Sequence, residues 1–257
     1  LQFKDVDTGN VNGHVPCGVS FLADIHEDEE PKNFRAASLF SHWQIAMQEE
    51  YDALKSQGTW ILVPPPHDRA VIGSKWVYKV KRNPDGTVSR YKARLVAQGF
   101  SQEQGLDYSE TFSPVVRHST VRLILALAAQ YNWNLRQLDV KNAFLHGELE
   151  EEVFMKQPQG FVDQQYPNHV CRLVKSLYGL KQAPRTWNSK FTSFLPALGF
   201  QTSMSDTSLF VKVDDSDVIL LLLYVDDIIL TGSNSEKIQT VIDDLAAVFE
   251  LKDMGKL

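Results

Sequence analysis

The sequence predicts an α+β fold in which helices pack on an antiparallel sheet. Three observations predict it: a short apolar strand ends at Asp139, a helical pattern begins near Pro184, and two strands lead to Asp226 and Asp227 before another helical pattern. This strand, helix, strand, strand, helix order is typical of a ferredoxin-like split unit. A chain of 257 residues that is 43% hydrophobic and 23% charged can form one substantial domain or two subdomains.

The beginning of the chain is acidic and has little periodicity. We expect residues 1–35 to be an acidic linker or disordered arm. A helix that ends at Gly58 should follow. Its apolar face is formed by residues at helical spacing, namely Leu39, Trp43, Met47, Tyr51 and Leu54. The prolines at 64–66 then favour an extended chain.

A basic hairpin is predicted next, with strands at 74–82 and 88–97 joined by the turn sequence at 83–86. Residues 73–98 contain seven Lys or Arg residues against one acid, Asp85. Alternation places the bases on one face of each strand: Lys79 and Lys81 on the first, and Arg90, Lys92 and Arg94 on the second. This pattern predicts a surface that faces a polyanion, with a solvated hairpin face as the alternative.

The formal net charge of -6 does not exclude a nucleic-acid partner, because the excess acid is local. Residues 1–60 hold four basic and ten acidic residues, which leaves 22 of the 26 Lys/Arg and 22 of the 32 Asp/Glu for the remainder. The chain beyond residue 60 is therefore balanced in charge.

The second half alternates helices and strands. Ser119 is expected to cap a helix that runs to about Tyr131. Leu123, Leu127 and Tyr131 are expected on the buried side of this helix. A helix over 183–198 uses Trp187, Phe191 and Phe194 as its apolar face, after Pro184 in the first turn. Pro196 falls inside that helix, where a proline costs about 3 kcal/mol or ends the helix. Strands near 207–213 and 218–225 follow, and Ser235 is expected to cap a last helix through Ile238, Ile242, Leu245 and Phe249.

Asp226 and Asp227 lie within the most apolar run of the chain, residues 218–230. Burying ionised carboxylates costs several kcal/mol unless a partner or metal compensates. A hairpin turn with two solvated aspartates is the alternative. Asp139 ends a second apolar stretch, so a strand beside the hairpin would bring three carboxylates to one sheet end. Mg²⁺ prefers such oxygen ligands, and two ions about 3.5 to 4 Å apart support in-line nucleotidyl transfer.

Several segments in a fixed order resemble a known family. They are SKWVYK (74–79), RYKARLVAQGF (90–100), ETFSPV (110–115), QLDVKNAFLHG (137–147), SLYGLKQAPR (176–185) and Tyr-Val-Asp-Asp (224–227). Together they resemble the reverse transcriptase of copia-type LTR retrotransposon Pol polyproteins, over roughly residues 43–257.

The resemblance implies a right-hand polymerase made of fingers and palm, with a ferredoxin-like antiparallel sheet in the palm. Residues 36–114 and 147–182 would form the fingers, and residues 115–146 and 183–257 the palm. Relatives continue into a primer-gripping hairpin, a thumb and a ribonuclease H domain, so we expect this chain to be an excerpt that lacks these segments. A fragment without a thumb should extend primers weakly.

The resemblance also implies the roles of individual residues. Asp139 and Asp226 would bind two Mg²⁺ ions, which Mn²⁺ could replace, and Asp227 would complete the acidic cluster. The backbone carbonyl of Val140 would add an oxygen ligand.

Other residues would meet the incoming nucleotide. Arg94, with Lys92 beside it, would bind the triphosphate, since arginine offers bidentate hydrogen bonds to phosphate. Phe144 would exclude a ribose 2′-hydroxyl, with an ordinary core phenylalanine as the alternative. Gly179, beside Tyr178, would let the backbone approach the template–nucleotide pair.

The implied partners are an RNA or DNA template with its primer, and deoxynucleoside triphosphates. The implied location is intracellular, in cytoplasmic virus-like particles or the nucleus, in agreement with two widely spaced cysteines and no membrane-spanning apolar run. A non-catalytic relic that keeps the fold and weak nucleic-acid binding stays open as an alternative. The acidic run at 148–152 is interpreted as a solvated surface.

Overall fold

The computed structural model describes residues 29–256. These residues form two lobes, each with its own hydrophobic core. The first core also takes Leu145 and Ala183, which the expected boundaries assigned to the other part of the chain. The expected arm at 1–35 lies mostly outside the described residues. Its last part is folded against the first lobe, because Pro31 is buried and helix α1 (Phe34–Ala37) spans the expected boundary at residue 35.

The first lobe combines a helix, a small sheet and a long hairpin. Its further elements are α2 (Ser41–Ser56), β1 (Trp60–Val63), β2 (Val71–Ile72), β3 (Ser74–Arg82), β4 (Val88–Ala97), η1 (Gly99–Ser101), β6 (Glu148–Met155) and β7 (Val170–Lys175). Strands β1, β7, β6 and β2 form a four-stranded sheet in that order. The alternation pattern predicted the β3–β4 hairpin but not this sheet, whose strands come from segments about 100 residues apart.

Helix α2 packs on β4 through Trp43, Met47 and Leu54, which are buried as predicted. Leu39 was expected on the same face, and this prediction was wrong: Leu39 precedes the helix and is exposed. Phe40 has an extended backbone (φ -118°, ψ 128°) and separates Leu39 from α2, so the helical period does not extend back to residue 39.

The second lobe is built on a six-stranded antiparallel sheet. Its elements are α3 (His118–Gln130), β5 (Arg136–Val140), η2 (Ala143–His146), α4 (Ala183–Phe194), η3 (Leu195–Leu198), β8 (Gln201–Thr202), β9 (Leu209–Asp214), β10 (Asp217–Tyr224), β11 (Asp227–Gly232), α5 (Ser235–Ala246) and β12 (Leu251–Lys256). The strand order is β12-β5-β11-β10-β9-β8. Helix α4 lies between β5 and the hairpin strands in sequence, and α5 lies between β11 and β12, which is the connection order of a βαββαβ unit.

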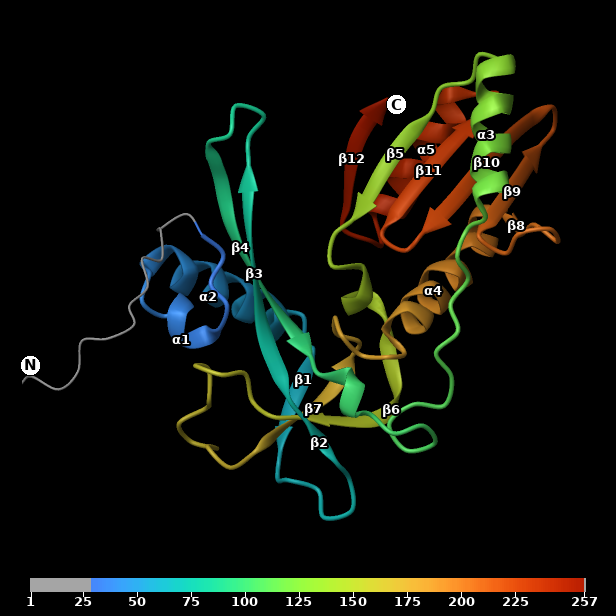
Figure 1. Cartoon of the computed structure of the whole chain (residues 1–257). Helices are drawn as coiled ribbons and strands as arrows, with labels where there is room; N and C mark the ends of the chain where they lie inside the picture. Colours follow the sequence, from blue (N-terminus) through green and yellow to red (C-terminus); the bar gives the residue numbers. More distant parts are fainter. Residues whose placement is uncertain (1–28, 257) are drawn as a thin grey trace, which may run out of the picture.

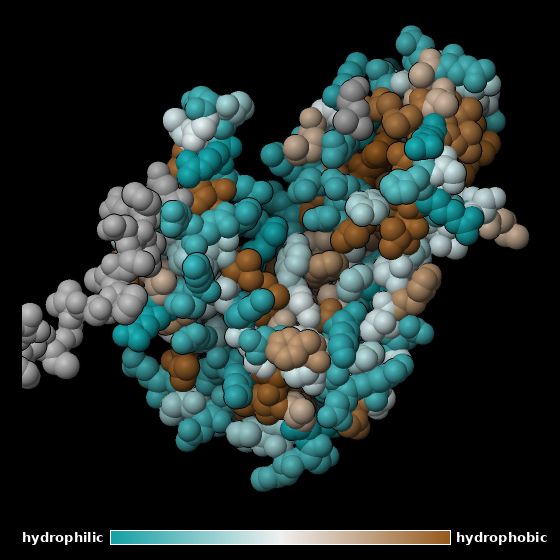
Figure 2. Space-filling view, viewed as in Figure 1, coloured by the Kyte–Doolittle hydropathy of each residue, from teal (hydrophilic) through white to brown (hydrophobic). Residues whose placement is uncertain are grey.

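Helices cover both faces of this sheet (Figure 1). One face packs on α4 and α5 through Leu138, Leu221, Ile228 and Leu230. The other face lies under α3, where Leu222 and Ile229 line a hollow with Val121 of the helix. The two lobes stand apart at the β3–β4 hairpin, and the space-filling view is hollowed between the hairpin tip and the six-stranded sheet (Figure 2).

Helix α3 differs from its prediction in both cap and register. Its N-terminus is held by Asp206, whose carboxylate accepts hydrogen bonds from the Arg117 backbone N–H (3.0 Å) and the Thr120 hydroxyl (2.6 Å), and Ser119 is an internal residue. Ile124 and Ala128 are buried, whereas Leu123 and Tyr131 are 54% and 57% exposed. The start of the helix is thus set by a residue 86 positions away, which a local cap signal cannot reveal.

The C-terminus of α4 and the N-terminus of α5 also differ from their predictions. Helix α4 ends at Phe194, and Pro196 belongs to the η3 turn, so the proline terminates the helix without lying inside it. Asn234, not Ser235, caps α5 by accepting hydrogen bonds from the backbone N–H groups of Glu236 and Lys237. Across residues 29–256, no helix combines the length and apolar character that crossing a bilayer requires.

Candidate active site

The three predicted carboxylates lie at one end of the six-stranded sheet. Asp139 on β5 is directly opposite Asp227 on β11, and directly opposed residues share a face of the sheet. Asp226 lies in the two-residue turn between β10 and β11. Its carbonyl accepts a hydrogen bond from the Val140 N–H (2.8 Å), which ties the turn to β5. Val140, whose carbonyl was expected as a ligand, is buried beside this contact.

The surroundings of Asp226 disfavour an unpaired charge. Burial raises the pKa of its carboxyl, the neighbouring Asp227 and Asp139 raise the pKa further, and Arg94 opposes them. Within the described part of the chain, no three carboxylate, imidazole or thiolate groups already converge tightly enough to hold a metal ion. The three aspartates supply the carboxylate oxygens that divalent cations prefer, at one end of the sheet.

Three of the predicted nucleotide-binding residues come together: Arg94 and Tyr178 of the first lobe and Phe144 of η2. Arg94 is near enough to Asp226 to affect its pKa. The Arg94 guanidinium lies 5.0 Å from the centroid of the Tyr178 ring, and Tyr178 meets Phe144 edge to face at 4.7 Å. Burial raises the pKa of Tyr178. Phe144 is partly buried and packs against both cores, so it has the contacts of a core residue as well as a position beside the site.

The structure explains why position 179 is occupied by glycine. Its φ is +90°, and an added Cβ would lie closer than 3.0 Å to the Ala97 carbonyl oxygen and 2.7 Å from a Val96 methyl carbon. The loop of Gly179 lies along the edge of β4, where the Ala97 N–H donates to the Tyr178 carbonyl (2.7 Å) and the Gly99 N–H to the Gly179 carbonyl (3.2 Å). The glycine therefore allows a close approach to β4, and its approach to a template–nucleotide pair stays a prediction.

The predicted basic residues share one face of the β3–β4 hairpin. Lys79 is directly opposite Lys92, and Lys81 is directly opposite Arg90. Burial and the nearby Arg94 and Arg90 lower the pKa of Lys92. Directly opposed like charges are destabilising, so this face favours an anionic partner. Lys79 is also ion-paired with Glu30 (3.0 Å), which covers part of the face.

Comparison with known proteins identifies the family. The family model described as "Reverse transcriptase (RNA-dependent DNA polymerase)" matches residues 57–257. The chain is 44% identical over 239 residues to the retrovirus-related Pol polyprotein from transposon RE1 of Arabidopsis thaliana, covering 93% of this chain and 16% of the relative. The chain is a copia-type reverse transcriptase domain.

A second relative agrees with this family. The domain is 44% identical over 237 residues to the retrovirus-related Pol polyprotein from transposon TNT 1-94 of Nicotiana tabacum, covering 90% of this chain and 18% of the relative. The domain thus spans less than one fifth of these relatives. A telomerase structure from Candida albicans, in complex with a fragment of telomeric RNA, matches with a TM-score of 0.33 at 11% identity, covering 80% of this chain and 45% of that one.

The structure adds residues to the reverse transcriptase site that sequence patterns did not single out. Gln137 donates a hydrogen bond to the Asp227 carboxylate (3.2 Å), and its position two residues before Asp139 placed it on the same face. Lys252 on β12 is directly opposite Asp139. The sequence around Lys252 does not indicate that this residue lies near Asp139, because its position depends on the pairing of β12 with β5.

Glu50 of α2 also contributes to the site. Its carboxylate accepts a hydrogen bond from the Leu95 N–H (3.3 Å) on β4. Burial raises the pKa of Glu50, while the Leu95 hydrogen bond and the nearby Lys92 and Arg94 act in the opposite direction. The carboxylate therefore supports the strand that carries the two predicted phosphate-binding residues.

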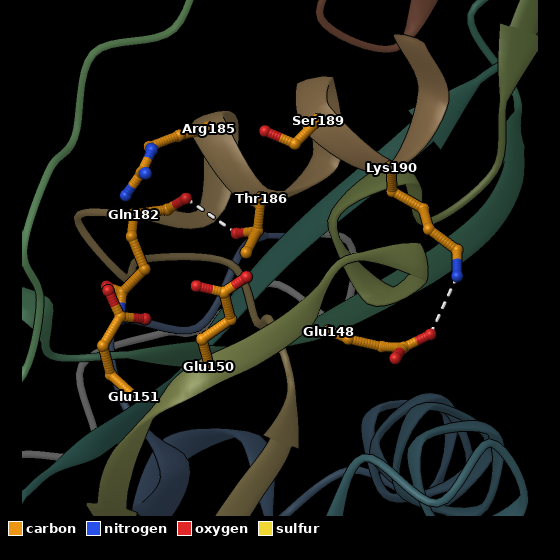
Figure 3. Close-up of a pocket in the computed structure, with 8 residues that line it drawn as sticks. All are labelled: Glu148, Glu150, Glu151, Gln182, Arg185, Thr186, Ser189 and Lys190. Atoms are coloured by element: carbon orange, nitrogen blue, oxygen red, sulfur yellow. Dashed lines mark hydrogen bonds and ion pairs between the residues drawn. The ribbon is translucent and has the colours of Figure 1, made fainter. Parts of the chain in front are cut away.

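The acidic run at 148–152 does not belong to the carboxylate site. Glu148, Glu150 and Glu151 line a pocket between β6 and α4, together with Gln182, Arg185, Thr186, Ser189 and Lys190 (Figure 3). Glu148 forms an ion pair with Lys190 (2.8 Å), and Glu151 accepts hydrogen bonds from Ser109. Glu148 and Glu151 therefore have partners of their own in the protein, and Glu148, Glu150 and Glu152 are exposed as predicted.

Proposed function

We propose that this domain catalyses template-directed DNA synthesis on RNA and DNA templates, by nucleotidyl transfer assisted by two metal ions. In this proposal the first lobe is the fingers and the second lobe is the palm. The observation that carries the proposal is the register of β5 and β11, which places Asp139 opposite Asp227 beside the Asp226 turn. In the proposed site, these carboxylates lie near the cluster of Arg94, Tyr178 and Phe144.

The aspartates would hold divalent cations, Mg²⁺ or in its place Mn²⁺. When bound, such ions lower the barrier to attack by the primer 3′-hydroxyl and stabilise the leaving pyrophosphate. Burial and the two neighbouring carboxylates raise the pKa of Asp226, and a nearby cation would stabilise its ionised form. Lys252, opposite Asp139, supplies a further positive charge at this sheet end.

Arg94 and Lys92 of the fingers, together with Phe144 of η2, would bind and orient the nucleotide. Arg94 is held over the Tyr178 ring, so its guanidinium has a restricted position from which to meet phosphate oxygens. Lys92 lies on the same face of β4, and burial together with the nearby Arg94 and Arg90 lowers its pKa, so a bound triphosphate would stabilise its charged form. Phe144 would exclude the ribose 2′-hydroxyl from its position against Tyr178.

The template–primer duplex would lie against the basic hairpin face. Lys81 and Arg90 are exposed and directly opposed, so phosphate binding would relieve their mutual repulsion. Lys79 would exchange its contact with Glu30 for a phosphate. This binding should weaken steeply with salt, since it consists largely of ionic contacts.

Primer extension on an RNA template tests the proposal. Extension of oligo(dT) on poly(rA) is measured with Mg²⁺ and with Mn²⁺, for the wild-type chain and for Asp226→Asn. Asp226→Asn should abolish nucleotide addition while primer–template binding, measured by fluorescence anisotropy, is retained. Asp215→Asn is the matched control, because Asp215 is an exposed aspartate in the turn between β9 and β10.

Each result has a defined meaning. Extension that survives Asp226→Asn would refute the assignment of the carboxylates. Wild-type chain that binds the duplex but extends it with neither ion would favour a non-catalytic nucleic-acid-binding fragment.

A further inference from the structure

The turn that carries Asp226 has an unusual backbone conformation. Tyr224 and Asp227 close the hairpin, so Val225 and Asp226 are its two central residues. Val225 has a φ of +55°. Hairpin turns with positive φ at the first central residue favour glycine there, and a β-branched residue with positive φ is an outlier. Such conformations persist only where the surrounding structure holds them.

Two hydrogen bonds from different elements hold this turn. The Trp187 indole Nε1–H of α4 donates to the Val225 carbonyl (2.6 Å). The Val140 N–H of β5 donates to the Asp226 carbonyl (2.8 Å). Both central carbonyls of the turn are therefore fixed from the palm side, which leaves the Asp226 side chain between two anchored peptide groups.

The indole that makes the first of these bonds is itself immobile. Trp187 is 1% exposed, and its ring lies 5.3 Å from Phe191, 5.5 Å from Phe249 and 5.7 Å from His146, measured between ring centroids. These contacts come from α4, η2 and the segment after α5. A ring enclosed on several sides cannot rotate away, so its N–H remains directed at the Val225 carbonyl.

We propose that Trp187 is a positioning residue: its indole N–H keeps Val225 in the left-handed conformation and thereby sets the direction of the Asp226 carboxylate toward the metal-binding position. The effect on the metal rests on the function proposed above. The bond depends on the N–H and not on the size of the ring, because a side chain of the same shape without this donor would leave the Val225 carbonyl unpaired.

An isosteric replacement separates these two properties. Benzothienylalanine has the shape of tryptophan but carries sulfur in place of the N–H, and amber suppression can introduce it at position 187. Trp43 is the matched control: its side chain is 0% exposed, and its indole nitrogen is buried without a hydrogen-bond partner among the described residues. The same replacement at Trp43 removes no hydrogen bond.

Two measurements report the consequence. Hydrogen–deuterium exchange of the peptide covering residues 222–229, without metal, reports the turn directly. Mn²⁺ binding, followed by electron paramagnetic resonance, reports the carboxylates. The replacement at Trp187 should speed exchange of the turn and weaken Mn²⁺ binding, each by about fivefold, as expected for loss of one hydrogen bond. The replacement at Trp43 should change neither, and exchange at the Asp215 turn serves as the internal reference.

The outcomes distinguish this inference from the proposed function. Unchanged exchange of the turn in the Trp187 variant would overturn the inference. Faster exchange with unchanged Mn²⁺ affinity would overturn the positioning role. Wild-type chain that binds Mn²⁺ no better than Asp226→Asn would refute the metal site, and the exchange comparison would still decide the hydrogen bond.

Discussion

Substitution of Gly179 tests whether this glycine is required by packing or by the nucleotide. Gly179→Ala introduces a Cβ that would overlap the Ala97 carbonyl oxygen, at a residue with a φ of +90°. Gly86→Ala is the matched control. Gly86 has a φ of +87°, and no other atom lies within 4 Å of a Cβ added at Gly86. The two substitutions share the backbone strain and the effect on the unfolded chain, and they differ in what the new methyl group meets.

The expected magnitudes follow from these contacts. Placing alanine in the left-handed region costs about 1–2 kcal/mol, which applies to both variants. At Gly179 the loop must also move away from β4, which lengthens the hydrogen bonds from Ala97 to Tyr178 (2.7 Å) and from Gly99 to Gly179 (3.2 Å). Each contributes about 1 kcal/mol, so Gly179→Ala should cost about 2 kcal/mol more than Gly86→Ala.

Urea unfolding at 25 °C, followed by tryptophan fluorescence, measures the difference in the free energy of unfolding. Thermal unfolding should show an additional loss of about 4–8 °C for Gly179→Ala. A difference below about 0.5 kcal/mol between the two variants would refute the packing argument. Lost primer extension without lost stability would instead favour the predicted approach of Gly179 to the template–nucleotide pair.

Three further predictions concern other parts of the domain. Phe144→Val should raise ribonucleotide incorporation relative to deoxynucleotide by about tenfold in single-nucleotide extension, and an unchanged ratio would make Phe144 a core residue only. Asp206→Ala should lower the free energy of unfolding by about 1–2 kcal/mol at pH 7, and a loss below the measurement error would show that α3 needs no cap. Burial would raise the pKa of Asp206, but hydrogen bonds from Thr120, Arg117 and Ser208 hold it below the ordinary 3.8. The part of the cost that depends on the ionised carboxylate should therefore be fully present above pH 3.8 and be lost as the pH falls through the lower folded-state pKa. Cys171 is fully buried and its pKa is raised to about 12, so in a Cys17→Ser chain it should react with a thiol reagent at pH 8 only after denaturation.

Short-range patterns in the sequence predicted much of the fold and the grouping of the three carboxylates. Alternating bases around a turn signal predicted the β3–β4 hairpin, and its strand bounds agree with the structure. The helical period and an early proline predicted α4. Carboxylates inside apolar runs predicted Asp139, Asp226 and Asp227 as one group, because an apolar strand gives such a charge no local partner.

Only the tertiary structure decided how distant segments meet. The register of α3 depends on Asp206, the need for Gly179 depends on β4, and the place of Lys252 depends on the pairing of β12 with β5. The Trp187 hydrogen bond to Val225 joins residues 38 positions apart. Periodicity and turn chemistry act over a few residues, whereas these contacts arise when separate elements pack, so no window of the sequence contains them.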